Sequence, residues 1–264
     1  MNGPKRTEPS LSRPASGIGL PGFQKLVVTG ATSGIGKATV MALRERGLTV
    51  YAVGRNEAIL AELSQACGSI PVAADVRDAA AIAAALEGVE VDILINNAGI
   101  LSTRATFHEI DPTEIDAMID VNLKAPMHLT RAFLPGMVKR RRGHLIYIGS
   151  SGGQAPYPNM GAYGPSKAGL SLFCDNLRCD LLGTSVRVSE IVPGRVETSL
   201  YRTSIPDGQA NAVLYDGYRS IQPENIAQII GNVIDLPVFV DVARVEVFPT
   251  DQATGGGSMV KYQQ

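Results

Sequence analysis

Short apolar runs alternate with helix-like segments along residues 25–95, and this alternation limits the possible fold more than any other feature of the sequence. Apolar runs at 25–29, 49–53, 70–74 and 91–95 are separated by segments at 36–46, 57–67 and 79–86 that are rich in alanine and leucine. Short buried runs of this kind are typical of parallel strands, and the helices between them form right-handed crossovers. The pattern predicts an α/β fold with a doubly wound parallel sheet of the Rossmann type.

The second half of the chain continues the pattern. Strands are predicted at 144–148, 186–192 and 244–248, and helices at 162–182 and 223–234. A helical segment at 112–137 is expected to break near Pro126 and Pro135, because proline lacks the N–H that a helix interior uses. No repeat or linker divides this region, so we predict a single domain over 23–264. Residues 1–22 hold four prolines and no periodicity, which predicts an irregular arm that either contacts a partner or stays solvated.

Composition excludes several classes of function. The 264 residues include 24 Lys and Arg against 25 Asp and Glu, a net charge of −1, and no tryptophan. A protein without a basic field or stacking aromatics is a poor candidate for nucleic-acid binding. The three cysteines form no Cys-x-x-Cys pair, which argues against a disulfide framework and a zinc site, so we predict no metal and a reducing, cytoplasmic location. No apolar run reaches the ~18–20 residues that span a bilayer, so no membrane partner is predicted.

The turn between the first strand and the first helix is rich in glycine. Gly30, Gly34 and Gly36 follow the spacing G-x-x-x-G-x-G within residues 29–36. Glycine permits a sharp turn and a close approach of the backbone to a pyrophosphate, and the N-terminus of the following helix attracts that anion. Glycine-rich turns also occur after strands without any ligand. Here strand, loop and helix stand in the order that dinucleotide binding requires, so the loop predicts a dinucleotide site.

The end of the second strand indicates which dinucleotide binds. An acidic residue at this point would hydrogen-bond the ribose 2′-hydroxyl of NAD, but Gly54 stands there and is followed by Arg55 and Asn56. A guanidinium suits a 2′-phosphate, so the sequence favours NADP(H) over NAD(H). The alternative is that Arg55 is an exposed residue at the start of a helix.

A tyrosine and a lysine begin the long helix after the strand at 144–148. Tyr163 and Lys167 are four residues apart, which places them on one face of that helix. A free tyrosine has a pKa near 10, and a neighbouring ammonium would lower it toward neutrality. Ser150, at the end of the adjacent strand, could hold the reacting oxygen. The Tyr-x-x-x-Lys spacing is common by chance, so on its own it carries little weight.

Seven motifs nevertheless occur together and in order. They are Thr29-Gly-x-x-x-Gly-x-Gly36, Asp75-Val76, Asn96-Asn-Ala-Gly99, Asn122, Ser150, Tyr163-x-x-x-Lys167 and Pro193-Gly194. With this set the chain resembles the short-chain dehydrogenase/reductase family over about residues 24–250. The separation of Ser150 and Tyr163 also matches that family, which favours Ser150 over Ser151.

The resemblance implies a role for each matched residue. Tyr163 would exchange a proton with the substrate oxygen, Lys167 would lower the pKa of Tyr163 and bind the nicotinamide ribose, and Ser150 would orient the substrate. Asn122 would hold a water in a proton relay from Lys167. The cofactor residues, with those of the glycine-rich loop and the second strand, would be Gly30, Thr32, Ser33, Gly34, Ile35, Gly36, Arg55, Asn56, Asp75, Val76, Asn97, Ala98, Gly99, Tyr163, Lys167, Pro193, Gly194, Val196 and Thr198. The family's subunit contacts, on the two long helices, would give a homotetramer or homodimer.

Further segments point to a subgroup. Residues 134–138, 143–144, 156–157, 176–178 and 183–187 resemble the NADP-dependent 3-hydroxy acid and serine dehydrogenases, whereas 248–252 are more like reductases of antibiotic-pathway aldehydes. The resemblance therefore implies NADP(H)-dependent interconversion of an alcohol and a carbonyl, with a 3-hydroxy acid as one candidate substrate. A reductase of a larger aldehyde or ketone and a non-catalytic NADP(H) sensor remain alternatives.

The substrate end of the predicted site is the least specified. A loop at about 198–217 is expected to close over the substrate. Arg195 either pairs with a substrate carboxylate or is solvated, and Tyr157 either lines the pocket or packs elsewhere. The basic run at 139–142 is interpreted as the end of a helix, where cations complement the helix dipole, rather than as a nucleic-acid site.

Overall fold

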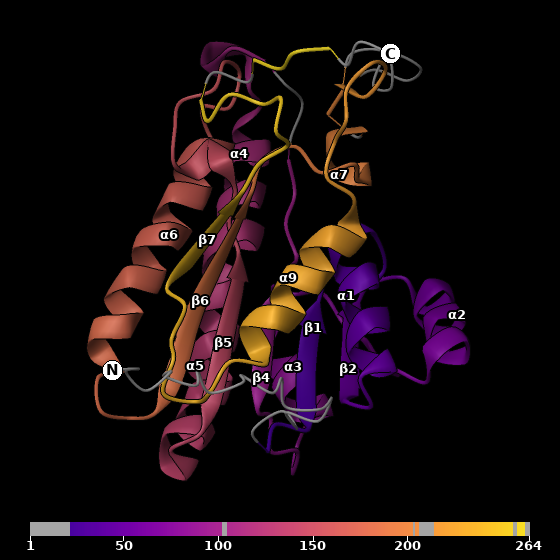
Figure 1. Ribbon diagram of the computed structural model, residues 1–264, viewed down its shortest axis with the longest axis vertical. Coiled ribbons are helices and arrows are strands. Elements are labelled where there is room, and N and C mark those ends of the chain that lie inside the picture. The colour runs from indigo at the N-terminus through magenta and orange to yellow at the C-terminus, as the bar shows by residue number, and fades with distance from the viewer. Residues whose placement is uncertain (1–21, 102–104, 203, 206–213, 256–257, 262–264) are drawn as a thin grey trace, which may run out of the picture.

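The computed structural model describes residues 22–101, 105–202, 204–205, 214–255 and 258–261. The predicted arm at 1–22 therefore lies outside the described residues except for Gly22, and much of the predicted loop at 198–217 does as well. Seven strands form one sheet in the order β3-β2-β1-β4-β5-β6-β7, and every neighbouring pair is parallel. The predicted doubly wound sheet is confirmed (Figure 1). The strands are β1 Lys25–Thr29, β2 Thr49–Gly54, β3 Ile70–Ala73, β4 Ile93–Asn96, β5 Gly143–Ile148, β6 Val186–Pro193 and β7 Arg244–Val247.

Helices cover both faces of the sheet. On one face lie α1 (Gly34–Glu45), α2 (Glu57–Cys67) and α9 (Pro223–Ile234), and on the other lie α3 (Ala79–Ala85), α5 (Ala125–Arg140) and α6 (Tyr163–Asp180). Shorter helices are α4 (Pro112–Ile119), α7 (Ser199–Arg202), the 3-10 turns Phe107–Glu109 and Ser151–Gly153, and a π-helix at Asp120–Lys124. Successive residues of β1 alternate between the two layers: Leu26 and Val28 pack with α1 and α9, and Val27 packs with α5 and α6. Burial on both faces explains why the strands read as continuous apolar runs.

The helical segment at 112–137 differs from its prediction. No break occurs at Pro135, which lies inside α5 on its exposed side, while Leu129 and Met137 anchor the helix in the core. An interior proline costs about 3 kcal/mol, and the burial of Leu129 and Met137 in the core outweighs that cost here. The irregularity lies before Pro126 instead, where the π-helix at Asp120–Lys124 carries Asn122. The predicted break near Pro126 thus corresponds to a change of helix type.

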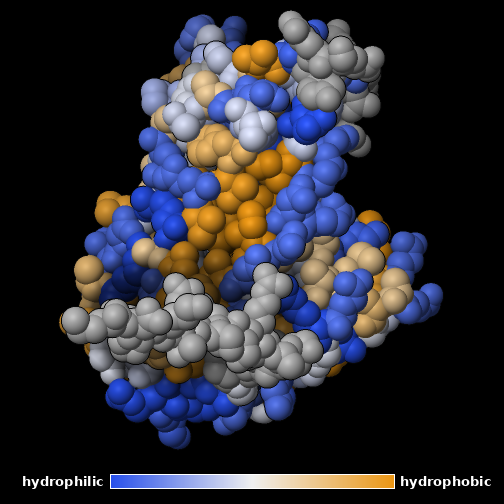
Figure 2. Space-filling model, viewed as in Figure 1, coloured by the Kyte–Doolittle hydropathy of each residue, from blue (hydrophilic) through white to orange (hydrophobic). Residues whose placement is uncertain are grey.

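One edge of the sheet stays partly uncovered. Figure 2 shows a strip of apolar residues between α6 and α9, where β7 forms the edge of the sheet and contributes the partly buried Val245 and Val247. The middle of the strand order matters more for the site. The order reverses between β1 and β4, and such a reversal opens a crevice at the carboxyl ends of the strands.

Candidate active site

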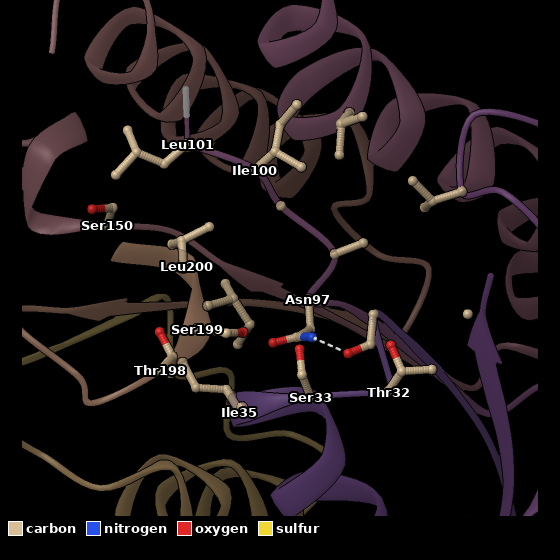
Figure 3. Close-up of a pocket in the computed structure, with 18 of the residues that line it drawn as sticks. Thr32, Ser33, Ile35, Asn97, Ile100, Leu101, Ser150, Thr198, Ser199 and Leu200 are labelled. Carbon is tan, nitrogen blue, oxygen red and sulfur yellow. Dashed lines mark hydrogen bonds between the residues drawn. The ribbon is translucent and has the colours of Figure 1, made fainter. Parts of the chain in front are cut away.

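A cleft of about 530 Å³ lies at the carboxyl ends of β1, β4 and β5 (Figure 3). It extends from Arg55 and Asp75, which follow β2 and β3, to Ser150 and Tyr163, which follow β5. Most of the predicted cofactor residues line it, namely Gly30, Thr32, Ser33, Gly34, Ile35, Arg55, Asp75, Val76, Asn97, Ala98, Gly99, Tyr163, Lys167, Pro193, Gly194, Val196 and Thr198. Gly36 and Asn56 do not line it. The topology therefore brings the separate motifs of the sequence to one crevice.

Hydrogen bonds hold the glycine-rich loop against the end of β4. The Asn97 side-chain amide donates to the carbonyl oxygens of Thr29 (2.8 Å) and Gly30 (3.3 Å), and the Thr29 hydroxyl accepts from the backbone N–H of Asn97 and of Ala98. Gly30 and Gly34 have φ angles of +65° and +49°, which side chains rarely adopt. These contacts fix the shape of the loop that faces the cleft.

Gly36 has a structural role that differs from its predicted cofactor contact. A methyl group on Gly36 would lie 2.2 Å from the Gly30 carbonyl oxygen and 2.5 Å from the Asn97 side-chain nitrogen. The residue is buried at the start of α1, so its lack of a side chain lets the helix pack against the loop. It shapes the phosphate loop from behind.

Two arginines face the far end of the cleft. Arg55 follows Gly54, where a methyl group would lie 2.6 Å from the Thr32 Cγ2 atom, so this strand end has no room for an acidic side chain. Arg77 was not predicted: it donates two side-chain hydrogen bonds to Asp75, at 3.0 and 2.7 Å, and also lines the cleft. These hydrogen bonds lower the pKa of the Asp75 carboxyl to about 2. Asp75 balances the charge of Arg77, so the net positive charge that favours an anion at this end comes from Arg55.

Asn56 caps a helix in this structure, and its predicted cofactor contact stays a prediction. Its side chain accepts a hydrogen bond from the Ile59 backbone N–H at 3.1 Å and so caps the N-terminus of α2. It is placed outside the cleft lining, and the capping role explains its residue type.

Ser150, Tyr163 and Lys167 lie together at the end of β5. Ser150 and Tyr163 lie close enough for the Ser150 hydroxyl to lower the pKa of Tyr163, and both residues are buried, with 5% and 4% of their surface exposed. Lys167 lies one helical turn after Tyr163 and donates from Nζ to the Ile148 carbonyl oxygen at 2.8 Å. A proton donor, a hydroxyl that can orient an oxygen and a cation therefore meet at one end of the cleft.

Burial dominates the electrostatics of these groups. It raises the pKa of Tyr163, and the nearby Ser150 hydroxyl opposes this rise only in part. The lowering of this pKa that was predicted from Lys167 is therefore not found in this structure. Burial also lowers the pKa of Lys167 to about 8, against the opposing charge of Glu190. The Lys167 ammonium is directed at the Ile148 carbonyl, which explains why it does not act on the tyrosine here.

Asn122 is fully buried behind this group rather than in the cleft lining. Its Oδ1 accepts from the Ile100 N–H at 2.8 Å, and its Nδ2 donates to the Ile100 carbonyl at 2.9 Å and to Ser166 Oγ at 3.1 Å. Gly99 lies against Asn122 and Lys167: a methyl group there would be 3.3 Å from Asn122 Oδ1 and 3.5 Å from Lys167 Nζ. The π-helix thus brings Asn122 beside Lys167. The predicted water relay stays a prediction.

The near end of the cleft has an apolar wall. Ile100, Leu101 and Leu200 line it near Ser150, together with Ser199 and Tyr201 (Figure 3). The sequence after Thr198 lacks periodicity, so it predicted neither the short helix α7 nor a role for residues 199–201. A wall of this kind favours an uncharged substituent on whatever binds there.

The two predicted substrate residues point elsewhere. The Arg195 guanidinium donates to the Leu214 carbonyl at 3.1 Å and lies over the ring of Tyr218, 5.7 Å from its centre. The Tyr157 hydroxyl donates to Ser151 Oγ at 3.1 Å. Neither residue lines the cleft, and packing contacts explain the placement of both.

Within the described residues, no group of three or more His, Cys, Asp or Glu side chains could hold a metal ion. No described helix is both long and apolar enough to cross a membrane. The cleft fits a dinucleotide, because it is long, cationic at one end and bounded by glycines where a side chain would fill the space.

Comparison with known proteins gives consistent matches. A family model for short chain dehydrogenases matches residues 24–208. A short-chain type dehydrogenase/reductase of Sinorhizobium fredii is 47% identical over 90% of this chain and 96% of its own length. An NADP-dependent 3-hydroxy acid dehydrogenase of Escherichia coli is 38% identical over 88% of this chain and 97% of its own. Among solved structures, the closed form of a serine dehydrogenase complexed with NADP⁺ superposes with a TM-score of 0.84, at 35% identity, over 91% of this chain and 100% of that one.

Proposed function

This chain belongs to the short-chain dehydrogenase family, and from that premise we propose that it is an NADP(H)-dependent oxidoreductase that interconverts an alcohol and a carbonyl compound. The observation that carries the proposal is the meeting of Ser150, Tyr163 and Lys167 at one end of a dinucleotide-shaped cleft. The family match and the NADP-dependent relatives support the same reading.

The chain's own residues account for the proton and the orientation of the substrate. Ser150 and Tyr163 hold the substrate oxygen between two hydroxyl groups, which polarises a carbonyl without a metal. Tyr163 gives its proton to that oxygen during reduction and takes it back during oxidation. Lys167 supplies a positive charge one turn away, and the Ile148 carbonyl orients it. When bound, NADP(H) supplies or accepts the hydride.

We propose that Arg55 selects NADP(H) by binding the 2′-phosphate, with Arg77 beside it. The Arg55→Ala variant is expected to raise the KM for NADPH by about 10-fold or more, because a charge-assisted hydrogen bond contributes about 1.5–3 kcal/mol. The KM for NADH should change little, since that cofactor lacks the 2′-phosphate. Steady-state rates with both cofactors test this, with Arg131→Ala, on the exposed side of α5, as the matched control. Equal losses with NADPH and NADH would contradict the assignment.

For the substrate we propose a 3-hydroxy acid, supported by the relatives that act on such compounds. The second candidate, an uncharged aldehyde or ketone, is favoured by the apolar wall of Ile100, Leu101 and Leu200. The initial rate of NADP⁺ reduction with 3-hydroxypropionate is measured against that with 1-propanol, which is similar in size and lacks the carboxylate. A rate that requires the carboxylate supports the first candidate. Turnover confined to uncharged alcohols and their carbonyl products supports the second.

We also propose a cytoplasmic homotetramer or homodimer. The three free cysteines suit a reducing compartment. Large apolar side chains are exposed on the two long helices, Met127 on α5 and Leu172 on α6, and they favour a subunit contact there. Light scattering after gel filtration gives the mass. A monomer at micromolar concentration would contradict this part of the proposal.

A further inference from the structure

A buried carboxylate lies beneath the active-site strand and has no part in the chemistry described above. Glu190, on β6, is fully buried. A methyl group on Gly149 would lie 2.4 Å from Glu190 Oε1. Gly149 joins Ile148, whose carbonyl holds Lys167, to Ser150, so the carboxylate packs against the backbone between the two contacts. A buried carboxylate is costly unless it is paired, so its presence here requires an explanation.

The contacts of Glu190 connect four elements of the site. Its Oε2 accepts from Arg244 Nε, on the neighbouring β7, and from Ser171 Oγ, each at 2.8 Å. Arg244 stands opposite Glu190 in the register of the two strands. Ser171 lies one turn after Lys167 on the same face of α6, and it also accepts from Gln154 Nε2 at 2.8 Å and from Arg244 Nη2 at 2.7 Å. Gln154 follows the 3-10 turn that begins at Ser151.

Only one oxygen of the carboxylate is used in these contacts. Glu190 Oε1 is buried and has no hydrogen-bond partner in the part of the chain that the structure describes. It is the oxygen that packs against Gly149. The negative charge is thus held by Arg244 and Ser171 on one side and left facing the end of β5 on the other.

We propose that Glu190 is a positioning residue which, held by Arg244 and Ser171, fixes α6 against the end of β5 and places a negative charge behind Lys167. The inference rests on the proposed function, because it gives Lys167 its role. It explains why a carboxylate, rather than an apolar side chain, occupies this part of the core.

The charges around the lysine support the assignment. Burial lowers the pKa of Lys167 to about 8, and the charge of Glu190 raises it, so the lysine would be less protonated at neutral pH without the carboxylate. On its own helix Lys167 faces Tyr163 and the Cys174 thiol. Burial raises the pKa of each of these two groups, and the charge of Glu190 raises the pKa of Cys174 further, so Tyr163 and Cys174 stay neutral. The charged group that contacts Glu190 is Arg244 on β7, which also pairs with Asp175 on α6, and Asp175 in turn pairs with Arg178. The neutral Tyr147 stands opposite Glu190 in the register of β5 and β6.

The test follows the titration of Lys167 directly. Protein labelled with ¹³C-lysine is titrated by NMR at the lysine Cε, and Lys167→Met assigns the signal. Glu190→Gln is expected to lower the Lys167 midpoint by about one pH unit, the low end of the effect of a neighbouring opposite charge. In an active enzyme, the basic limb of the kcat/KM profile for reduction should move by the same amount. Glu246→Gln, the same change at an exposed position on β7, should move neither.

The paired variant Glu190→Gln with Arg244→Gln removes both members of the buried ion pair, so it keeps the test open if the single variant does not fold. An unchanged Lys167 titration in folded Glu190→Gln would overturn the inference, and so would a Lys167 midpoint in the paired variant equal to that of Arg244→Gln alone. The NMR titration needs no turnover: a wild type without NADP-dependent activity would overturn the proposed function, and the effect of Glu190 on Lys167 would still be measured.

Discussion

Tyr163→Phe is expected to lower kcat for carbonyl reduction by about 10²–10⁴-fold, the usual contribution of a positioned acid–base group. Phenylalanine keeps the buried ring and its packing and removes only the hydroxyl group. Without that hydroxyl, the substrate oxygen would have to draw its proton from water. NADPH binding, followed by the fluorescence of the nicotinamide, should change little. A loss in kcat with binding retained is the signature of a group that acts on the reacting oxygen.

The control for this prediction is Tyr51→Phe, the same change on β2 outside the cleft, which should leave both kcat and binding unchanged. A Tyr163→Phe variant as active as the wild type would contradict the proton-transfer role. If the wild type bound NADPH but turned over none of the tested substrates, the non-catalytic NADP(H) sensor would become the better explanation. The two outcomes are separable because binding and turnover are measured on the same samples.

The fold was predictable because its signals are local. Each strand is a short apolar run, since both faces of a parallel sheet are covered, and each helix begins and ends near a glycine, a proline or a polar cap. Pro135 is the exception: the local rule predicts a break, but the packing of Met137 two residues later keeps the helix intact. The family membership predicted from the ordered motifs is confirmed by the comparisons.

The candidate site was predictable only where a residue type and its spacing carry the chemistry. Ser150, Tyr163 and Lys167 fall into this class, because a strand end and one helical turn define their relation. Arg77 was missed because an arginine two residues after Asp75 is typical of a solvated turn. Only the structure shows that it binds Asp75 and lines the cleft. The orientation of Arg195 depends on Leu214 and Tyr218, which are distant in sequence, so no local pattern could give it.

Glu190 shows the same limit more strongly. In the sequence it is one acidic residue in an apolar strand. No local sequence pattern indicates that Arg244 stands opposite it or that Gly149 leaves room for its carboxylate. The relation exists only through the strand register and the packing of α6. Residues that act through others are therefore found from the structure, whereas residues that touch the substrate can be found from motifs.

Gly36→Ala is expected to weaken NADPH binding by at least about 10-fold and to destabilise the fold by about 1–3 kcal/mol, the usual cost of forcing one extra carbon into a packed region. The new methyl group would lie 2.2 Å from the Gly30 carbonyl oxygen, a distance that real contacts do not reach, so the backbone must move. The loop has little freedom to do so, because Gly30 is held at φ +65° and its carbonyl accepts from Asn97. Movement of α1 instead would displace the helix N-terminus that faces the cleft.

Either displacement would disturb NADPH binding directly. The loss of NADPH affinity should therefore exceed the loss that lower stability alone produces. Gly136→Ala is the matched control: it lies in a helix away from the cleft, and its methyl group would meet only the flexible end of Arg140 at 3.1 Å. That variant should bind NADPH as the wild type does and be as stable or slightly more so, since alanine favours the helix. Thermal unfolding and NADPH titration are measured on both variants. If Gly36→Ala bound NADPH normally at a temperature where it is fully folded, the shape of the loop would not control cofactor binding, and the role given to this glycine would be wrong.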